Sequence, residues 1–229
     1  MEVLYEDNHV IIVGKQAGEI VQGDKTGDTP LVDIVRQYVK ESCAKPGNVF
    51  LGVAHRLDRP VSGVVCFART SKALARLNRL FREGGVKKTY LAITANVPPA
   101  EEGRLVHWLV RHERQNKSYA FDHEVPRSKR AELSYRLVGR SERYCLLAVD
   151  LKTGRHHQIR CQLARMGCPI RGDLKYGAPR SNPDGSISLH AWSIAFRHPV
   201  SGRDVSVTAP LPSDNLWQAF NPLFTLHEK

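Results

Sequence analysis

The stretch HRLDRPVSGVVCFA, residues 55–68, places a single acid, Asp58, between Arg56 and Arg59 and then runs into a continuous apolar segment. Such a segment, bounded by turn-forming residues, is typical of a buried strand. Loop residues at the end of a strand are common positions for functional sites. From the charge pattern alone, Asp58 is open to two interpretations: a structural ion pair, or a carboxylate kept ionised for chemistry.

The sequence before and after this stretch predicts strands with interspersed helices. Residues 3–15 read as a strand, a turn and a second strand. Apolar residues at helical spacing between Leu31 and Val39, Ile34 among them, predict a helix, which the loop CAKPGN at residues 43–48 ends. A second helix is predicted after Ser71, a suitable N-cap, with Gly84 at its end.

Strand patterns dominate from residue 86 to about Asp150, and the spacing changes to a helical one in HQIRCQLARMG, residues 157–167. A hairpin is predicted around Pro199–Gly202. Together these patterns predict a single α+β domain over residues 1–229, with a mixed or antiparallel central sheet and flanking helices.

The amino-acid composition indicates which binding partners and which cellular location to expect. Lys and Arg total 34 against 23 Asp and Glu, a formal charge of +11 that favours a polyanion such as nucleic acid, although a merely soluble basic protein stays possible. No apolar run is long enough for a membrane span, and no signal pattern opens the chain, so a cytoplasmic location is expected. The five cysteines form no C-x-x-C pair, which favours reduced thiols.

A second basic stretch is LKTGRHHQIR, residues 151–160, in which Gly154 ends a strand and cations surround the next helix start. Backbone N–H groups and basic side chains at this point suit a phosphate, and a solvated basic turn is an equal alternative. The adjacent His156 and His157 cannot share one helical face, and no further ligand motif accompanies them. The sequence therefore predicts no metal site.

A third stretch is KKTYLAI, residues 87–93. Tyr90 is either a half-buried strand residue or a ring that stacks on a base and offers its hydroxyl for a hydrogen bond. The phosphate-binding glycine motifs of nucleotide cofactors do not occur in this sequence, so no cofactor is predicted.

These three stretches, in this order and followed by CPIRGDLKYG at residues 168–177, resemble the RluA-type RNA pseudouridine synthases. The resemblance extends from Leu4 to Pro212. The histidine before Arg-Leu-Asp is more similar to this branch than to the RsuA-type branch. The resemblance implies the fold of the pseudouridine synthase catalytic domain, without the small S4 RNA-binding domain of some relatives.

The resemblance also implies roles for four residues. Asp58 matches the essential catalytic aspartate. Three residues match substrate-binding positions: Arg56 helps to hold a uridine out of its stack, Tyr90 packs against the target base, and Arg160 pairs with the aspartate. The implied activity is that of an isomerase, which converts uridine to pseudouridine in structured RNA, either tRNA or rRNA. It needs no cofactor, no metal, no membrane and no obligate protein partner.

Three places depart from the common family pattern: Gln16, Pro60–Val61 and Cys161–Gln162. They leave the RNA contacts and the identity of the target uridine open, and the sequence does not decide whether Asp58 is a nucleophile or a base. The alternative function is a non-catalytic basic RNA-binding protein, which would not need Asp58. A metal-dependent nuclease would require a cluster of ligands that the sequence lacks.

Overall fold

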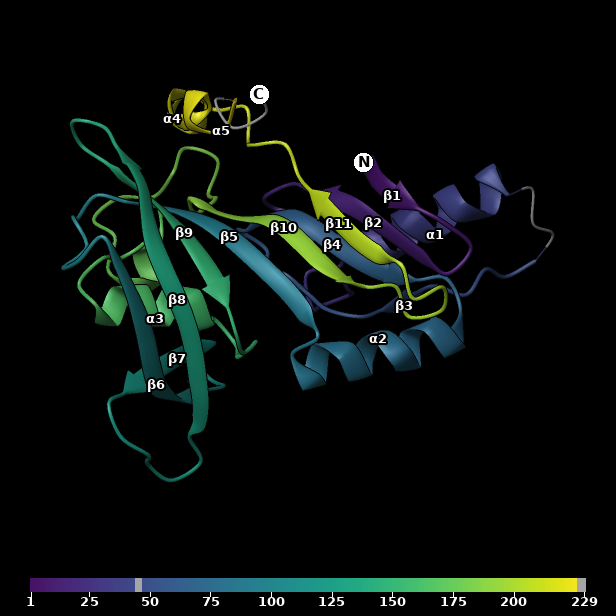
Figure 1. Ribbon diagram of the computed structural model, residues 1–229, viewed down its shortest axis with the longest axis horizontal. Coiled ribbons are helices and arrows are strands. Elements are labelled where there is room, and N and C mark those ends of the chain that lie inside the picture. Colours follow the sequence, from purple (N-terminus) through teal and green to yellow (C-terminus); the bar gives the residue numbers. More distant parts are fainter. Residues whose placement is uncertain (44–46, 226–229) are drawn as a thin grey trace. The chain divides into compact units, whose positions relative to one another are not determined.

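The computed structural model describes residues 1–43 and 47–225, and Figure 1 shows its helices and strands. The chain divides into two compact units. Unit 1 contains Met1–Lys87 and Ser193–Pro210, and unit 2 contains Lys88–Trp192 and the segment from Leu211 onward. Two strands, β5 (Val86–Thr94) and β10 (Leu189–Arg197), contribute residues to both units.

Unit 1 combines short strands with two helices. Besides parts of β5 and β10, its elements are β1 (Glu2–Glu6), β2 (Val10–Lys15), α1 (Leu31–Ser42), β3 (Gly52–Val53), β4 (Ser62–Ala68), α2 (Ser71–Glu83) and β11 (Asp204–Thr208). β2 pairs with β4 in antiparallel register, with Ile11 opposite Phe67 and Val13 opposite Val65. All four of these side chains are fully buried. The apolar run after Asp58 is therefore a core strand, as its sequence predicts.

The helices of unit 1 differ in detail from the sequence predictions. The N-cap of α2 is Thr70 rather than Ser71, because the Thr70 side chain accepts a hydrogen bond from the Ala73 N–H. Gly84 ends the helix in the left-handed conformation, as expected. Ile34, predicted on the core face of α1, is 37% exposed, because the buried side of α1 is formed by Leu31, Val32, Val35 and Val39. Of the predicted loop at residues 43–48, residues 44–46 lie outside the described part of the chain.

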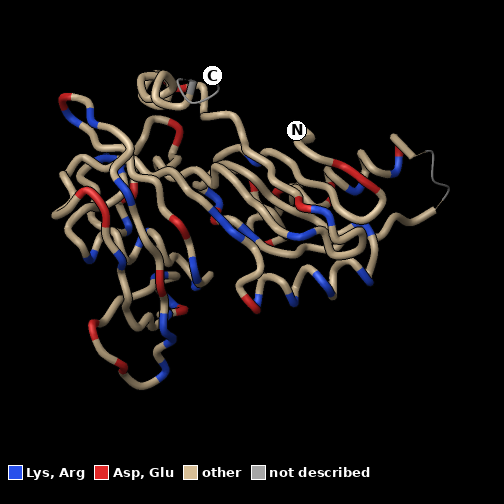
Figure 2. Tube along the Cα trace, viewed as in Figure 1, with Lys and Arg blue, Asp and Glu red and all other residues tan. Residues whose placement is uncertain are grey.

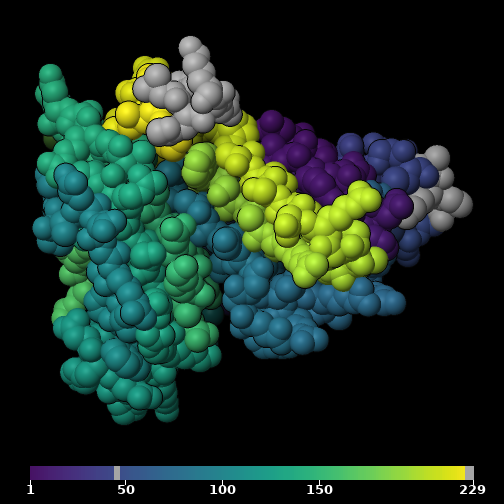
Figure 3. Space-filling view, in the orientation of Figure 1, coloured from purple at the N-terminus to yellow at the C-terminus, as the bar shows by residue number. Residues whose placement is uncertain are grey.

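β11 is a good example of a half-buried strand. It pairs with β10 in antiparallel register, from Ser193 opposite Thr208 to Arg197 opposite Asp204. Its side chains alternate between buried and exposed, with Val205 and Val207 inside. The exposed side of this hairpin is visible as yellow-green atoms in Figure 3. The hairpin predicted around Pro199–Gly202 is thus confirmed.

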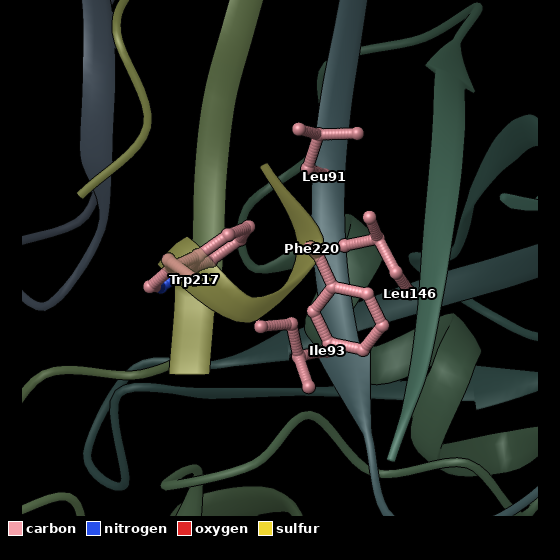
Figure 4. Packing of buried hydrophobic residues seen from close by; sticks show 5 residues of the cluster. All are labelled: Leu91, Ile93, Leu146, Trp217 and Phe220. Atoms are coloured by element: carbon pink, nitrogen blue, oxygen red, sulfur yellow. The ribbon is translucent and has the colours of Figure 1, made fainter. Parts of the chain in front are cut away.

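Unit 2 is rich in long strands. Besides parts of β5 and β10, its elements are β6 (Glu102–His112), β7 (Lys117–Phe121), β8 (Lys129–Arg140), β9 (Cys145–Leu151), α3 (Gln158–Arg165), the short 3₁₀ helix η1 (Leu174–Tyr176), α4 (Asn215–Phe220) and α5 (Pro222–Thr225). One face of β5 and β9 packs against α4 through Leu91, Ile93, Leu146, Trp217 and Phe220 (Figure 4). This packing anchors α4 to the strands of unit 2.

A second cluster joins α3 to the strands β6, β7 and β8. Cys161 and Ala164 of α3 pack with Leu109, Ala120 and Ala131, which share one face of these strands. In Figure 1, β8 passes in front of α3. Helix α3 therefore covers one side of this three-stranded segment.

The described strands number eleven and follow the hydrogen-bonded order β1-β2-β4-β10-β5-β9-β8-β6-β7, with β3 on β4 and β11 on β10. The predicted fold class is confirmed: a mixed, largely antiparallel sheet with flanking helices. The prediction of one catalytic domain over residues 1–229 stays a prediction. All five cysteines carry free thiols, four of them buried. Within the described residues, every helix is too short or too polar to cross a membrane.

Candidate active site

Asp58 lies in a tight turn that leads from β3 into β4. The Val61 N–H donates to the Asp58 carbonyl at 3.0 Å and so closes the turn. The Gly18 N–H donates to the Arg59 carbonyl at 2.8 Å and ties the turn to the segment after β2. The Asp58 side chain is half-buried. The carboxylate is therefore carried by a backbone that has little freedom to move.

A buried ammonium group holds the inner side of this turn. Lys15 is 1% exposed, and its Nζ donates to the carbonyls of Val61 at 2.6 Å, Arg59 at 3.1 Å and Asp58 at 3.3 Å. Burial lowers the pKa of Lys15 from 10.5 to about 8, although the charges of Glu19 and Asp58 oppose this effect. No role for Lys15 was predicted from the sequence. A lone lysine at the end of the apolar strand VIIVGK is the signal that could have identified it.

The cations on either side of Asp58 have different surroundings. Arg56 is exposed, which suits a residue that reaches RNA. Arg59 donates to Asp28 at 2.6 Å and to Thr26 at 2.6 Å, and it lies 3.4 Å from Asp24. Arg59 thus stabilises the loop before α1. The arginine that follows Asp58 in the sequence is engaged with other acids.

His55 joins the start of the motif to β4. Its Nε2 accepts a hydrogen bond from the Cys66 N–H at 3.0 Å, and its ring lies 4.8 Å from that of Phe81 in α2. A backbone N–H can only donate, so this nitrogen carries no proton and the imidazole is neutral. His55 therefore ties the start of the motif to β4, a contact that was not predicted from the sequence.

Tyr90 occupies the centre of β5, opposite Val149 of β9, and is 9% exposed. Because side chains alternate along a strand, Tyr90 lies on the opposite face from Leu91 and Ile93 of the α4 cluster. Lys88 shares the face of Tyr90, and burial lowers the pKa of the Lys88 ammonium. Tyr90 is buried and Lys88 is half-buried, and the proposed role of Tyr90 against a base stays a prediction.

The basic stretch after β9 is held by a buried amide. Gln158 is 3% exposed; its Oε1 accepts from the Thr153 hydroxyl at 2.7 Å and from the Arg155 N–H at 3.0 Å, and its Nε2 donates to the Glu132 carbonyl at 3.0 Å. His157, the N-cap of α3, adopts the left-handed conformation with φ 54°. This conformation is unfavourable for a residue with a Cβ and persists only where its surroundings enforce it. The loop from Thr153 to His157 is therefore rigidly defined.

The two adjacent histidines anchor this loop to β7 and η1. Their rings stack with centroids 3.7 Å apart. A His156 ring nitrogen lies 2.9 Å from the Ser118 hydroxyl, and a His157 nitrogen lies 3.0 Å from the Tyr176 hydroxyl. The Ser118 N–H donates to the same Tyr176 hydroxyl at 2.8 Å, and burial raises the pKa of Tyr176. These contacts give both histidines a structural explanation that needs no metal.

Arg160 forms a buried bidentate ion pair with Asp173. Its Nε donates to Oδ2 at 2.7 Å and its Nη2 to Oδ1 at 2.9 Å, while the two residues are 5% and 1% exposed. The guanidinium also lies over the Tyr176 ring, 5.2 Å from its centroid. Five N–H donors are available on a guanidinium, so this pair does not exhaust it. Asp173 lies in the stretch CPIRGDLKYG, and the sequence analysis did not assign it a role.

The four predicted site residues are divided between the units. Arg56 and Asp58 belong to unit 1, and Tyr90 and Arg160 belong to unit 2. The predicted pairing of Arg160 with Asp58 stays a prediction. Within each unit the structure adds the groups that hold these residues: Lys15 and His55 in unit 1, and Gln158 and Asp173 in unit 2.

Helix α2 carries a concentrated positive charge. Its exposed side presents four cations and one acid, a net charge of 4 − 1 = +3: Lys72, Arg76, Arg79, Arg82 and Glu83. Blue segments recur along the helix in Figure 2. A surface of this kind attracts a polyanion.

Comparison with known proteins identifies the class. Residues 9–165 match the family described as RNA pseudouridylate synthase. An RNA pseudouridine synthase of Chlorobaculum parvum is 33% identical, over 93% of this chain and 71% of the relative. The ribosomal large subunit pseudouridine synthase D of Xanthomonas campestris is also 33% identical, over 93% of this chain and 67% of the relative.

Solved structures show the same fold. The human RNA pseudouridylate synthase domain containing 4 superposes with a TM-score of 0.81 at 21% identity, over 97% of this chain and 93% of that one. The fold and the family match define an RNA-modifying isomerase of the pseudouridine synthase class. Within this class, the chain belongs to the RluA family. The family and the isomerase activity predicted from the sequence are confirmed.

Proposed function

We propose that this protein isomerises a uridine of large-subunit ribosomal RNA and that Asp58 is the essential catalytic carboxylate. The choice of ribosomal RNA over tRNA is supported by the names of relatives, including large-subunit synthases D and C. RNA as the partner is implied by the family and agrees with the charge of +11. The cytoplasm, where reduced thiols persist, is the location that this proposal implies.

The observation that carries the assignment of Asp58 is the fixed turn around it. Three carbonyls of that turn, those of Asp58, Arg59 and Val61, receive hydrogen bonds from one buried ammonium group. A surface ion pair would not need such a support, whereas a reacting group must be held close to its productive geometry. The supported turn therefore favours a catalytic role for Asp58 over the alternative of a non-catalytic RNA-binding protein.

The proposed reaction is an isomerisation within one nucleotide. The bond between N1 of uracil and C1′ of ribose breaks, the base rotates, and a bond forms between C5 and C1′, while the hydrogen on C5 is released and N1 gains one. A stacked base cannot rotate, so the uridine must be flipped out at a cost of roughly a few kcal/mol. Arg56 and Tyr90 are proposed to hold the flipped nucleotide, and Arg160 to orient the carboxylate. The atoms balance without a cofactor or a metal.

The release of the C5 hydrogen provides the test. Large-subunit ribosomal RNA and tRNA are transcribed with tritium at C5 of uridine, and tritium release is measured with the wild type, Asp58→Asn and the control Asp33→Asn. We expect release from ribosomal RNA with the wild type and Asp33→Asn, none with Asp58→Asn, and retained RNA binding by all three. A chelator should leave the rate unchanged. Turnover by Asp58→Asn would overturn the assignment, and release from tRNA alone would overturn the proposed substrate.

A further inference from the structure

Exposed aromatic side chains are concentrated on one strand of unit 2. Among the described residues, the exposed Phe, Tyr and Trp side chains are Phe50, Tyr119 and Phe121. Two of these three belong to β7, which has only five residues. Large rings on a soluble surface are usually isolated, so two rings on one short strand suggest a contact surface.

The register places these rings on one face with a third ring. Trp108 of β6 lies opposite Phe121 on one side and Arg130 of β8 on the other, and Val110 lies opposite Tyr119. Directly opposed residues share a face of an antiparallel sheet. We call Trp108, Val110, Tyr119 and Phe121 the aromatic face. The reverse side of the same strands is the side that α3 covers.

The rings of the aromatic face are held in place and bordered by cations. The Tyr119 hydroxyl donates to Gln115 Oε1 at 2.6 Å, which fixes the ring. Lys117 Nζ lies 5.5 Å from the centroid of that ring. Arg130, beside Trp108 in the register, is half-exposed and pairs with Glu132 at 2.8 Å. Aromatic planes next to cations are the combination that binds single-stranded nucleic acid.

We propose that the aromatic face binds unpaired nucleotides of the substrate RNA, with bases stacked on Trp108, Tyr119 and Phe121 and phosphates near Lys117 and Arg130. This inference rests on the proposed function, which supplies RNA as the substrate. A duplex cannot occupy the face in this way, because its bases already stack on one another.

The charge of the surrounding segment favours RNA over an apolar partner. The segment from Glu102 to Arg136 contains eight Lys and Arg against five Asp and Glu, a net charge of 8 − 5 = +3.

The contact would favour uridines in loops. Bases next to an unpaired target are themselves free to stack on protein rings, whereas bases within a helix are not. Stacking of these neighbours offsets part of the free energy of flipping the target. The aromatic face therefore contributes to the choice of substrate rather than to the chemical step.

The test compares ring removal with ring retention. Binding of a single-stranded oligouridine of about ten nucleotides is measured by fluorescence anisotropy with full-length protein. We expect Tyr119→Ala/Phe121→Ala to weaken binding at least about fivefold, and Tyr119→Phe to bind like the wild type. Phe50→Ala removes the exposed aromatic ring of unit 1 and should also bind like the wild type. A blunt RNA duplex should bind all four proteins equally. Equal binding of the oligouridine by wild type and double variant would overturn the inference.

A second measurement needs no variant. Oligouridine substituted with thiouridine is crosslinked by light to the wild type, and the attached peptides are identified by mass spectrometry. Crosslinks within β6 and β7 support the inference, and their absence from both strands contradicts it. The molar mass of the protein in solution is also measured without RNA. If this mass rises with protein concentration for the wild type but not for the double variant, and RNA affinity is the same for both, a second copy of the chain occupies the aromatic face. That result would overturn the inference. The anisotropy and crosslinking experiments both measure RNA binding, whereas the tritium assay measures isomerisation. Failure of the tritium assay would therefore overturn the proposed function and leave the evidence for the aromatic face unchanged.

Discussion

Arg160 and Asp173, thirteen positions apart in the chain, form two parallel hydrogen bonds of 2.7 and 2.9 Å at the start of α3, and both side chains are buried. The pair fixes the guanidinium plane, because a bidentate contact permits little rotation. The orientation of the Arg160 guanidinium is therefore fixed without bound substrate. Removing either partner leaves the other as a buried charge.

Asp173→Ala is expected to lower the free energy of unfolding by about 3–5 kcal/mol, because it removes the buried carboxylate that forms the bidentate pair with Arg160. Asp173→Asn keeps one oxygen acceptor and should lose less. Urea unfolding of both variants measures the effect, with the exposed Asp204→Ala as the control. A loss below about 0.5 kcal/mol for Asp173→Ala would show that the pair is not structurally important.

Arg160→Met should lower the single-turnover rate on the substrate RNA by about a hundredfold, because the group proposed to orient Asp58 is lost. Arg160→Met alone leaves the Asp173 carboxylate buried without the guanidinium. The double variant Arg160→Met/Asp173→Asn removes that charge as well, so it separates the loss of rate from a loss of stability. Arg165→Met, an exposed change on the same helix, is the matched control. If both Arg160 variants react at the wild-type rate, Arg155 becomes the next residue to test.

Lys15 predicts a specific dependence of stability on pH. Its pKa is lowered from 10.5 to about 8 in the folded protein, so between these values the unfolded chain binds more protons at this position. The free energy of unfolding contributed by Lys15 should therefore rise with pH across this window and stay constant below about pH 8, where both states are protonated. Lys15→Met removes this dependence and takes the ammonium donor away from three turn carbonyls. The Asp58 and Arg59 carbonyls keep their backbone N–H donors, so the cost, about 1–3 kcal/mol for a buried group left unsatisfied, falls on the Val61 carbonyl.

The measurement is urea unfolding of the wild type and Lys15→Met at several pH values across the same window. The difference in the free energy of unfolding between the two proteins reports the contribution of Lys15, because the other titrating groups contribute equally to both. A difference that does not change with pH would contradict the burial of a charged Lys15.

RNA affinity should fall steeply with salt, because a protein of charge +11 binds largely through phosphates. Helix α2 offers the most direct check. Lys72→Gln/Arg82→Gln should make the slope of log K against log salt shallower by about one to two. Asp204→Asn serves as a control that leaves all cations in place. A slope equal to that of the wild type would mean that α2 does not contact the RNA backbone.

Local pattern was enough for most of the secondary structure. The apolar run from Gly63 to Ala68 predicts a buried strand, and the spacing around Leu77 predicts α2. The errors concern details that neighbours decide, such as the N-cap at Thr70 instead of Ser71. The motifs around Asp58, Tyr90 and Arg160 led to the family because residue type and order are properties of the sequence itself.

Only the tertiary structure decided which groups support these residues. Lys15 meets the carbonyls of a turn more than forty positions away, Gln158 meets the Glu132 carbonyl, and Arg160 meets Asp173. The aromatic face, likewise, exists only because the register sets Trp108 opposite Phe121. Local spacing determines whether a segment is a helix or a strand, because that choice depends on neighbours in sequence. A buried charge or polar group is satisfied by whichever partner the folded chain brings within hydrogen-bond distance, and residue order alone does not contain that information.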